Sequence, residues 1–292
     1  MPSTRDIRRR IKSVKNTAQI TKAMQMVAAS KMRKAQAAAL AGRPYADLMN
    51  EVLSALVAGN KDFTHPLLEQ RDVRKRCIII ISTDKGLCGA LNSALMREAV
   101  KFPADAAYIT AGRKAALFIA RVRRPLVAEF TYKDSPAFAE ARAIAKFACD
   151  LYLKGECDQV DILFTKFVST LVQKPEIRQL LPITEIKPVK AGIGGEAVPA
   201  AASPGASGEF VFEPDQEHVL GALLPHSLNF QVYQILLESK ASEHSARMVA
   251  MKNATDNAKQ FIKDLTLEYN KLRQANITKE LLEITSAAMA MG

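Results

Sequence analysis

Apolar side chains recur with helical spacing near the start of the chain. Ile7, Ile11, Val14, Ala18 and Thr21 step by 4, 3, 4 and 3 residues, and neither glycine nor proline interrupts residues 3–41. This spacing places one apolar edge along a helix, and it is typical of a helix that packs against a second helix.

Beyond this point the apolar edge of the helix is expected to drift. The next apolar residues are Met24, Val27, Ala28 and Met32. A drift of this kind suits a helix that changes partner along its length. Pro44 is expected to kink or briefly interrupt the helix because it lacks a backbone N–H donor. The helical pattern resumes at Tyr45 and stops at Gly59.

The central part of the chain alternates between strand-like and helix-like segments. The continuous apolar run at 77–81 is typical of a buried strand. Further strands are expected at 106–110, 126–130, 160–168 and 170–173, the last two as a hairpin, and helices are expected at 90–101, 112–120 and 137–153. Strands that alternate with helices of 10–15 residues predict a mainly parallel sheet.

A second long helix is expected at the end of the chain. No proline or glycine occurs between Pro225 and Ala290, and the helix is predicted to begin at about Pro225. Both terminal helices carry apolar edges, so antiparallel pairing of the two would bury both edges. The fold class predicted is therefore α/β, with an inserted Rossmann-like domain on a mainly parallel sheet between two long helices that form an antiparallel coiled coil.

Four regions are expected along the chain. They are an N-terminal coiled-coil helix (1–58), an α/β domain (75–190), a flexible loop rich in Gly, Ala, Pro and Ser (191–208), and a last extended stretch with the C-terminal coiled-coil helix (209–292).

Charge is distributed unevenly between the two ends. Residues 1–43 hold eleven Lys or Arg and one acidic residue, whereas residues 213–292 hold eight Lys or Arg and ten Asp or Glu. The basic run at 8–15 is equally compatible, by residue chemistry alone, with nucleic acid and with an acidic protein surface as partner. A basic coiled-coil adaptor that binds nucleic acid is therefore the alternative function.

Other residues favour an interaction protein over an enzyme. The four cysteines form no CxxC pair and are expected to be reduced thiols, and no apolar run approaches the roughly 20 residues that span a bilayer. The turn at 84–89 follows a strand and opens a helix but lacks both common phosphate-loop spacings. A tight turn is the preferred interpretation, and a nucleotide-binding enzyme is the third alternative. The four histidines are scattered, and we expect no cofactor, metal or catalytic site.

Four sequence blocks closely resemble the gamma subunits of bacterial F-type ATP synthases. They are IKSVKNTAQITKAMQMVAASKMRKAQ (11–36), ISTDKGLCGALN (81–92), ASEHSARMVAMKNATDNA (241–258) and YNKLRQANITKELLEI (269–284). The resemblance covers essentially the whole chain. It implies a non-catalytic central rotor shaft that couples proton-driven rotation of the membrane c-ring to conformational change at the beta-subunit sites, and ATP-driven pumping in reverse.

The resemblance also implies partners and a location. The expected partners are three alpha and three beta subunits, the epsilon subunit and the c-ring, with no nucleic acid and with membrane contact only through the complex. The expected location is the cytoplasmic face of the bacterial inner membrane, as a peripheral protein. No cysteine pair of the chloroplast regulatory type is present, so control of rotation by thiols is not expected.

Nine residues match positions that contact other subunits in this family. Met24 and the basic residues Lys31, Arg33 and Lys34 are expected to meet an acidic loop of beta. Polar contacts to the ring of alpha and beta subunits are expected from Arg247, Arg273, Gln274, Thr278 and Glu280. The resemblance further implies that residues 284–291 enter an apolar sleeve of the ring.

Overall fold

A computed structural model describes residues 3–59, 65–183, 213 and 215–291, so the flexible loop expected at 191–208 and the extended stretch expected from 209 to 212 lie outside the described residues. The chain divides into two compact units, one formed by Met1–Ala28 with Met248–Gly292 and the other by Ala29–Arg247. The order of elements is α1 (Thr4–Ala41), α2 (Arg43–Gly59), β1 (Arg76–Ile81), α3 (Leu91–Val100), β2 (Ala107–Ala111), α4 (Arg113–Arg121), β3 (Leu126–Phe130), α5 (Phe138–Leu153), β4 (Gln159–Phe167), β5 (Gln173–Leu181) and α6 (Gln216–Met291).

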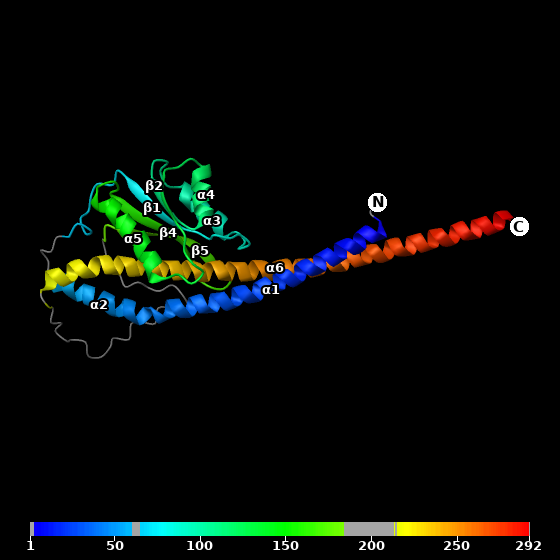
Figure 1. Cartoon of the computed structure of the whole chain (residues 1–292), viewed down its shortest axis with the longest axis horizontal. Helices are drawn as coiled ribbons and strands as arrows, with labels where there is room; N and C mark the ends of the chain where they lie inside the picture. Colours follow the sequence, from blue (N-terminus) through cyan, green and yellow to red (C-terminus); the bar gives the residue numbers. More distant parts are fainter. Residues whose placement is uncertain (1–2, 60–64, 184–212, 214, 292) are drawn as a thin grey trace. The chain divides into compact units, whose positions relative to one another are not determined.

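The first unit is a pair of antiparallel helix ends (Figure 1). The start of α1 lies beside the second half of α6, and the hydroxyl oxygens of Thr21 and Thr255 are 2.7 Å apart. Ile7, Met251 and Leu265 are buried within this unit. The predicted antiparallel pairing of the terminal helices is confirmed.

The second unit is built around a five-stranded sheet in the order β3-β2-β1-β4-β5. Neighbouring strands are parallel from β3 through β4, and only β5 runs antiparallel, against β4. Parallel strands need crossover connections, which α3, α4 and α5 provide. The predicted α/β class with a mainly parallel sheet is therefore confirmed.

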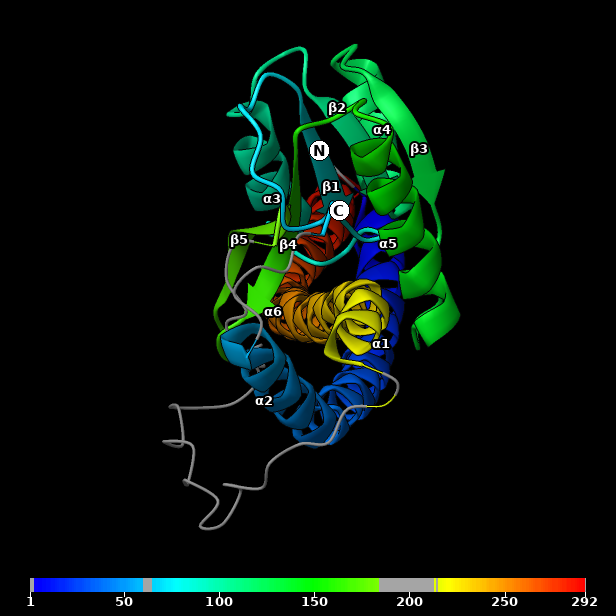
Figure 2. The same cartoon turned by 90° about the vertical axis from the view of Figure 1, so that its left-hand side faces the viewer.

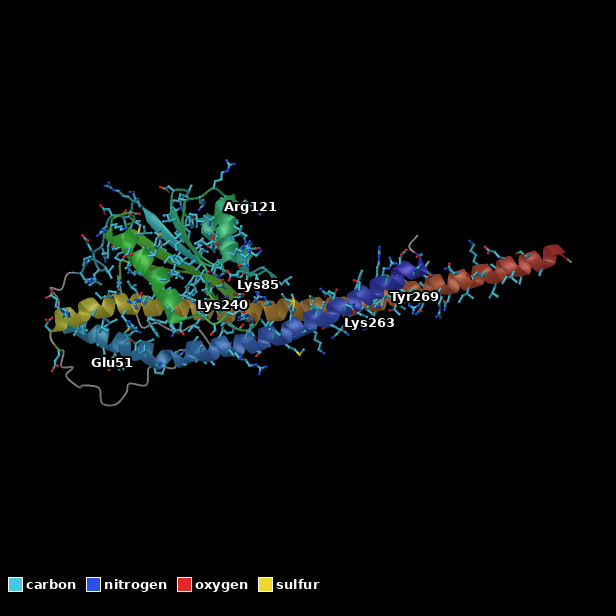
Figure 3. The ribbon with its side chains drawn as sticks, viewed as in Figure 1. Glu51, Lys85, Arg121, Lys240, Lys263 and Tyr269 are labelled. Atoms are coloured by element: carbon cyan, nitrogen blue, oxygen red, sulfur yellow. The ribbon has the colours of Figure 1, made fainter. Side chains whose placement is uncertain are left out.

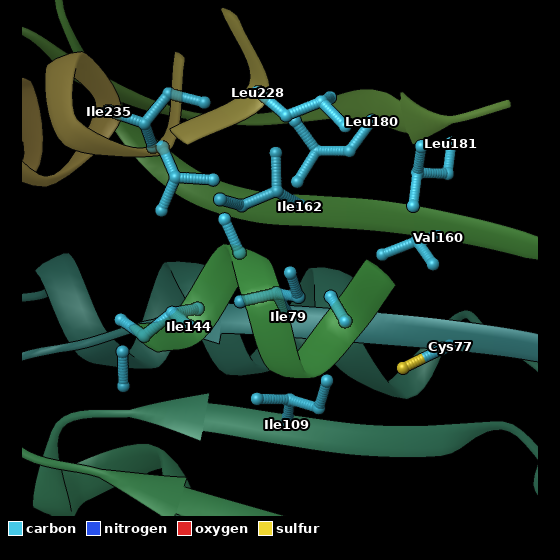
Figure 4. Close-up of a cluster of buried hydrophobic side chains, with 14 of the residues drawn as sticks. Cys77, Ile79, Ile109, Ile144, Val160, Ile162, Leu180, Leu181, Leu228 and Ile235 are labelled. Carbon is cyan, nitrogen blue, oxygen red and sulfur yellow. The ribbon is translucent and has the colours of Figure 1, made fainter. Parts of the chain in front are cut away.

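Both faces of the sheet are covered, with α3 and α5 on opposite sides of β1 (Figure 2), and the alternation along β1 decides which side chain faces which layer. Ile79 and Ile81 pack with α5 and α6, whereas Ile78 and Ile80 pack with α3 and α4. Figure 4 shows the first layer, in which Leu228 and Ile235 of α6 approach Ile162 of β4. A strand that is buried on both faces must be apolar throughout, which accounts for the continuous run at 77–81.

The break between the first two helices lies where the sequence predicts it. Helix α1 ends at Ala41, α2 begins at Arg43, and Pro44 occupies the first turn of α2. Proline is tolerated at this position because the N–H groups of the first turn have no intrahelical partner. Helix α2 packs through Ala46, Met49 and Leu53 against Leu220 and Leu224 of α6.

Three expectations from the sequence are wrong. Residues 170–172 of the strand expected at 170–173 form a turn, in which Leu171 is 75% exposed, and the second hairpin strand is Gln173–Leu181. Pro175 lies inside this strand, where it is tolerated because β5 is an edge strand and needs donors on one side only.

The C-terminal helix begins at Gln216, nine residues before the predicted start, and contains both Gly221 and Pro225. Burial of Leu220 and Leu224 against α2 favours the helix more than these two residues oppose it.

The apolar edge of α1 also does not drift. Ala28 and Met32 are buried as expected, and burial continues at Ala35 and Ala39, whereas Val27 is 55% exposed. Thr21 and Ala28 are seven residues apart, so the edge keeps a coiled-coil repeat rather than passing onto Val27. No helix in the described part of the chain is both long enough and apolar enough to span a bilayer.

Candidate functional site

Helix α6 contains a segment that is buried on every side. All thirteen residues of Gln234–Ala246 are buried, and eight of them are polar or charged. We call Gln234–Ala246 the buried polar segment. Helices normally bury one apolar stripe and expose the rest, so a polar helix surrounded on all sides requires specific partners.

Ion pairs on α6 form the centre of this segment. Glu243 accepts from Lys240 (Nζ to Oε2, 3.0 Å) and from Arg247 (Nη2 to Oε1, 2.8 Å). The side chains of Lys240 and Glu243 are 1% and 4% exposed, and that of Arg247 is 12% exposed. The i, i+3 and i, i+4 spacings place the three side chains on one face of the helix.

Two other elements join this face of α6. The carboxylate of Asp134, in the loop between β3 and α5, lies 3.7 Å from the ammonium of Lys240 and 2.5 Å from that of Lys31 on α1. The Lys31 ammonium holds the pKa of the Asp134 carboxyl below its usual value. Asp134 therefore connects α1 to α6 through the α/β body.

The turn between β1 and α3 is held by the same cluster. Arg247 donates to the carbonyl oxygens of Lys85 (3.4 Å) and Gly86 (3.3 Å). Figure 3 labels Lys85 and Lys240 in this region. The turn is a tight strand-to-helix connection, as the sequence predicts, and its carbonyl groups face a guanidinium.

Aromatic and imidazole groups complete the cluster. The ammonium of Lys240 lies 4.5 Å from the ring centroid of Tyr132, whose hydroxyl donates to the carbonyl of Ser82 (3.0 Å). Burial lowers the pKa of His244 to about 4, so this imidazole is neutral at physiological pH. Two cations therefore face one fully buried carboxylate and a neutral histidine.

Three further polar side chains fasten α6 to β4 and to the loop that follows it. Glu238 accepts from the backbone N–H of Phe167 (3.2 Å), and Ser242 donates to the carbonyl of Thr165 (2.9 Å). Ser245 donates to the carbonyl of Thr170 (2.8 Å). Burial raises the pKa of Glu238 to about 7.

This arrangement can resist movement of the helix relative to the α/β body. Apolar contacts have little directionality, so on their own they oppose rotation of a helix about its axis weakly. Buried hydrogen bonds and ion pairs have fixed geometry, and each is costly to break. The buried polar segment therefore holds α6 at one depth and one angle within its unit.

The nine residues predicted from the sequence fall into different environments. Lys31 and Arg247 both belong to this cluster. Arg33 and Lys34 are exposed on α1. Met24 is half-buried in the paired helices, and Arg273, Gln274, Thr278 and Glu280 are exposed on the last part of α6.

Sequence reasoning missed the roles of Lys240, Glu243 and Asp134. The spacing of Lys240, Glu243 and Arg247 was a usable signal, because charges three and four residues apart share one face of a helix. Asp134 gave no such signal, since it lies more than a hundred residues from both of its partners along the chain.

Comparison with known proteins shows which family the chain resembles. A family model described as ATP synthase matches residues 3–291. The ATP synthase gamma chain of Opitutus terrae is 53% identical over 99% of both chains, and that of Methylacidiphilum infernorum is 48% identical over the whole of both.

Solved structures agree with this placement. A chain in the central stalk and c-ring structure of the Tetrahymena thermophila mitochondrial ATP synthase is 26% identical, with a TM-score of 0.60, and the match covers 80% of this chain and 99% of that one. A chain of the Euglena gracilis mitochondrial ATP synthase has the same fold, with a TM-score of 0.67 at 21% identity, and covers 99% of this chain and 94% of that one. None of these comparisons supports the nucleic-acid-binding alternative. The chain belongs to the family of ATP synthase gamma chains.

Proposed function

We propose that this chain is the central rotor shaft of a bacterial ATP synthase and has no catalytic site of its own. In this role it couples proton-driven rotation of the membrane c-ring to conformational change at the beta-subunit sites, and it supports ATP-driven pumping in reverse. The relatives named as gamma chains and the similarity to a chain of the Tetrahymena central stalk and c-ring structure support this proposal.

One structural observation carries the proposal. Every residue of α6 from Arg273 to Met289 is exposed, although this stretch includes several large apolar side chains. Ile277, Leu281, Leu282, Ile284 and Met289 are 48–85% exposed. A helix end that is apolar and unpartnered requires cover from other polypeptides. Enclosure by a ring of three alpha and three beta subunits would provide that cover.

The buried polar segment supports the transmission of torque, which is the second requirement of a rotor shaft. Torque applied to the α/β body reaches the catalytic subunits only if the body and α6 turn together. The pair of Lys240 and Glu243 opposes slippage between them because separating two buried charges is costly, and Asp134 adds a partly solvent-screened contact from the body. We infer that the body faces the epsilon subunit and the c-ring, and that the complex holds the chain peripherally at the cytoplasmic face of the inner membrane.

The exposed polar residues are the proposed subunit contacts. Arg33 and Lys34 are available to an acidic loop of beta, together with the partly exposed Met24. Arg273, Gln274, Thr278 and Glu280 are available to the surrounding ring. Lys31 and Arg247 already form ion pairs within the chain. They are therefore proposed as subunit contacts only in addition to these pairs.

Reconstitution tests the function. The chain is mixed with alpha and beta subunits from the same source, and the mixture is analysed by size exclusion and ATPase assay. We expect one copy to elute with three alpha–beta pairs and ATPase activity to depend on its presence. If the chain does not elute with the alpha and beta subunits, the proposal is wrong.

A matched pair of variants tests the observation that carries the proposal. Leu281→Asp/Ile284→Asp is expected to weaken assembly while leaving the unfolding of the isolated chain unchanged, because both side chains are exposed. Val73→Asp/Leu171→Asp makes the same change at two exposed apolar positions elsewhere and is expected to assemble normally. Equal assembly of both variants would exclude the end of α6 as the enclosed element.

A further inference from the structure

A groove lies between α3 and α4, outside the buried polar segment. Its volume is about 580 Å³, and all of its lining residues come from these two helices. Helices α3 and α4 cover the face of the sheet opposite to α5 and α6. An occupant of this groove would therefore leave the contacts of α6 untouched.

The floor of the groove is apolar and partly open to solvent. It is formed by Met96 and Val100 of α3 and by Leu117 and Phe118 of α4. Val100 and Leu117 are 46% and 53% exposed, whereas Met96 is buried. Exposed apolar side chains gathered in a concavity are typical of a binding surface rather than of scattered surface residues.

Three basic side chains, Arg97, Lys114 and Arg121, border this floor. All three are exposed, and none has an ion-pair partner within the part of the chain that the structure describes. No acidic residue lines the groove, and Glu98, the nearest acidic residue in sequence, already pairs with Lys101 at 2.8 Å. The groove therefore presents an apolar centre with three uncompensated positive charges.

The spacing of these charges selects the kind of ligand. Lys114 and Arg121 lie seven residues apart on α4, which is about 10 Å along a helix axis. Two carboxylates two turns apart on a helix have the same axial spacing, so an acidic helix can pair with both cations at once. Lining positions 93, 96, 97 and 100 of α3 and 114, 117, 118 and 121 of α4 both follow the i, i+3, i+4, i+7 pattern, so the groove runs along both helices.

Given the proposed function, on which this inference rests, we propose that the α3/α4 groove binds an acidic amphipathic helix of another polypeptide of the complex. Its apolar stripe would lie on Met96, Leu117 and Phe118, and its Asp or Glu side chains would meet Arg97, Lys114 and Arg121. The lengths of α3 and α4 accommodate roughly ten residues of such a helix. This mode of recognition uses apolar anchors for affinity and charges for register.

Site-specific crosslinking in the assembled complex tests this proposal. Leu117 is replaced by a benzophenone amino acid, the complex is purified and irradiated, and the crosslinked peptide is identified by mass spectrometry. We expect an adduct on a helical segment with at least two acidic residues beside an apolar stripe. An absent adduct, an adduct to lipid, or an adduct to a segment without acidic residues overturns the proposal.

Charge variants make the test specific. Arg97→Glu/Lys114→Glu/Arg121→Glu is expected to lower the adduct yield at low salt by about tenfold, and the corresponding triple Gln variant is expected to lower it less. The control Arg142→Glu/Lys146→Glu/Lys154→Glu makes the same change on α5 and at its C-cap, on the other face of the sheet, and should leave the yield unchanged. Equal yields from the groove variant and the control overturn the proposal. Because the groove variants leave α6 intact, their ATPase activity in the reconstituted complex tests the rotor function separately.

Discussion

Glu243 is the residue on which the buried polar segment depends most. It is the single carboxylate between Lys240 and Arg247, and Lys240 is 1% exposed. Glu243→Gln keeps the shape of the side chain but leaves a buried ammonium whose remaining carboxylate, that of Asp134, is 3.7 Å away. Breaking a buried pair by removing one partner costs roughly 3 kcal/mol or more. We expect a loss of this size in the free energy of unfolding, measured with urea on the isolated chain.

A surface pair supplies the control for this variant. Glu283 lies 3.7 Å from Lys279, and both side chains are more than half exposed. Glu283→Gln is expected to change the free energy of unfolding by less than about 0.5 kcal/mol, because solvent screens exposed pairs. If the two variants were equally stable, the ion pairs of the buried polar segment would contribute little.

Glu238 makes stability depend on pH in a predictable direction. Burial raises its pKa to about 7 from an ordinary value of 4.5, with Lys166, Glu176 and Arg178 as the neighbouring charges. The fold therefore favours the protonated carboxyl. The contribution of the protonated Glu238 carboxyl to the free energy of unfolding is fully present below pH 4.5 and is lost as the pH rises through 7.

Glu238→Gln is accordingly expected to stabilise the chain at pH 8 and to have little effect at pH 5. The gain at pH 8 is bounded by roughly 3 kcal/mol, the free energy that corresponds to this change in pKa. Thermal unfolding at the two pH values measures it. A gain of the same size at both pH values would show that relief of a buried charge is not the cause.

At the scale of elements, the turn between β2 and α4 depends on one glycine. Gly112 has φ of +107°, and a Cβ at this position would lie 2.2 Å from the carbonyl oxygen of Ser82. Gly112→Ala is expected to lower the free energy of unfolding by roughly 3 kcal/mol, because strained backbone and a backbone clash combine. Gly221→Ala in α6 is the control, since no atom lies within 4 Å of its Cβ, and it should stabilise by about 0.5–1 kcal/mol. A loss from both variants would contradict this explanation.

The sequence is sufficient for elements whose own residues determine them. The run at 77–81 and the spacing of Ile7, Ile11 and Val14 predict β1 and the start of α1 because their burial pattern is local. It is not sufficient where distant packing decides the outcome. The strand through Pro175 depends on its place at the sheet edge, and the early start of α6 depends on contacts with α2.

The candidate site follows the same rule. The charges on α6 are visible in the spacing of Lys240, Glu243 and Arg247, whereas their partners Asp134 and the carbonyls of the turn at 85–86 become neighbours only through the topology of the sheet. The family resemblance singled out Lys31 and Arg247 as subunit contacts. It gave no indication that both pair within the chain.

At the scale of the whole molecule, the distribution of charge predicts how the shaft meets its surroundings. The chain carries a net charge of +11, and residues 1–43 hold eleven of its basic residues. Arg33 and Lys34 are exposed and have no ion-pair partner among the described residues, in contrast to Lys31. Coulomb attraction has no preferred direction and is screened within about 8–10 Å at physiological salt. Such charges can hold a turning shaft near acidic loops without fixing it at one angle.

Arg33→Gln/Lys34→Gln is therefore expected to lower ATP-driven proton pumping by the reconstituted complex at low salt, and the difference from wild type should shrink as salt is added. Unfolding of the isolated chain should change by less than about 0.5 kcal/mol, because both side chains are at the surface. Arg142→Gln/Lys146→Gln removes two exposed charges from α5 and should pump normally. Added salt weakens Coulomb attraction but not side-chain packing. A pumping defect that persists unchanged at high salt would therefore show that Arg33 and Lys34 act through shape. Normal pumping at low salt would remove these two residues from the proposed contact with beta.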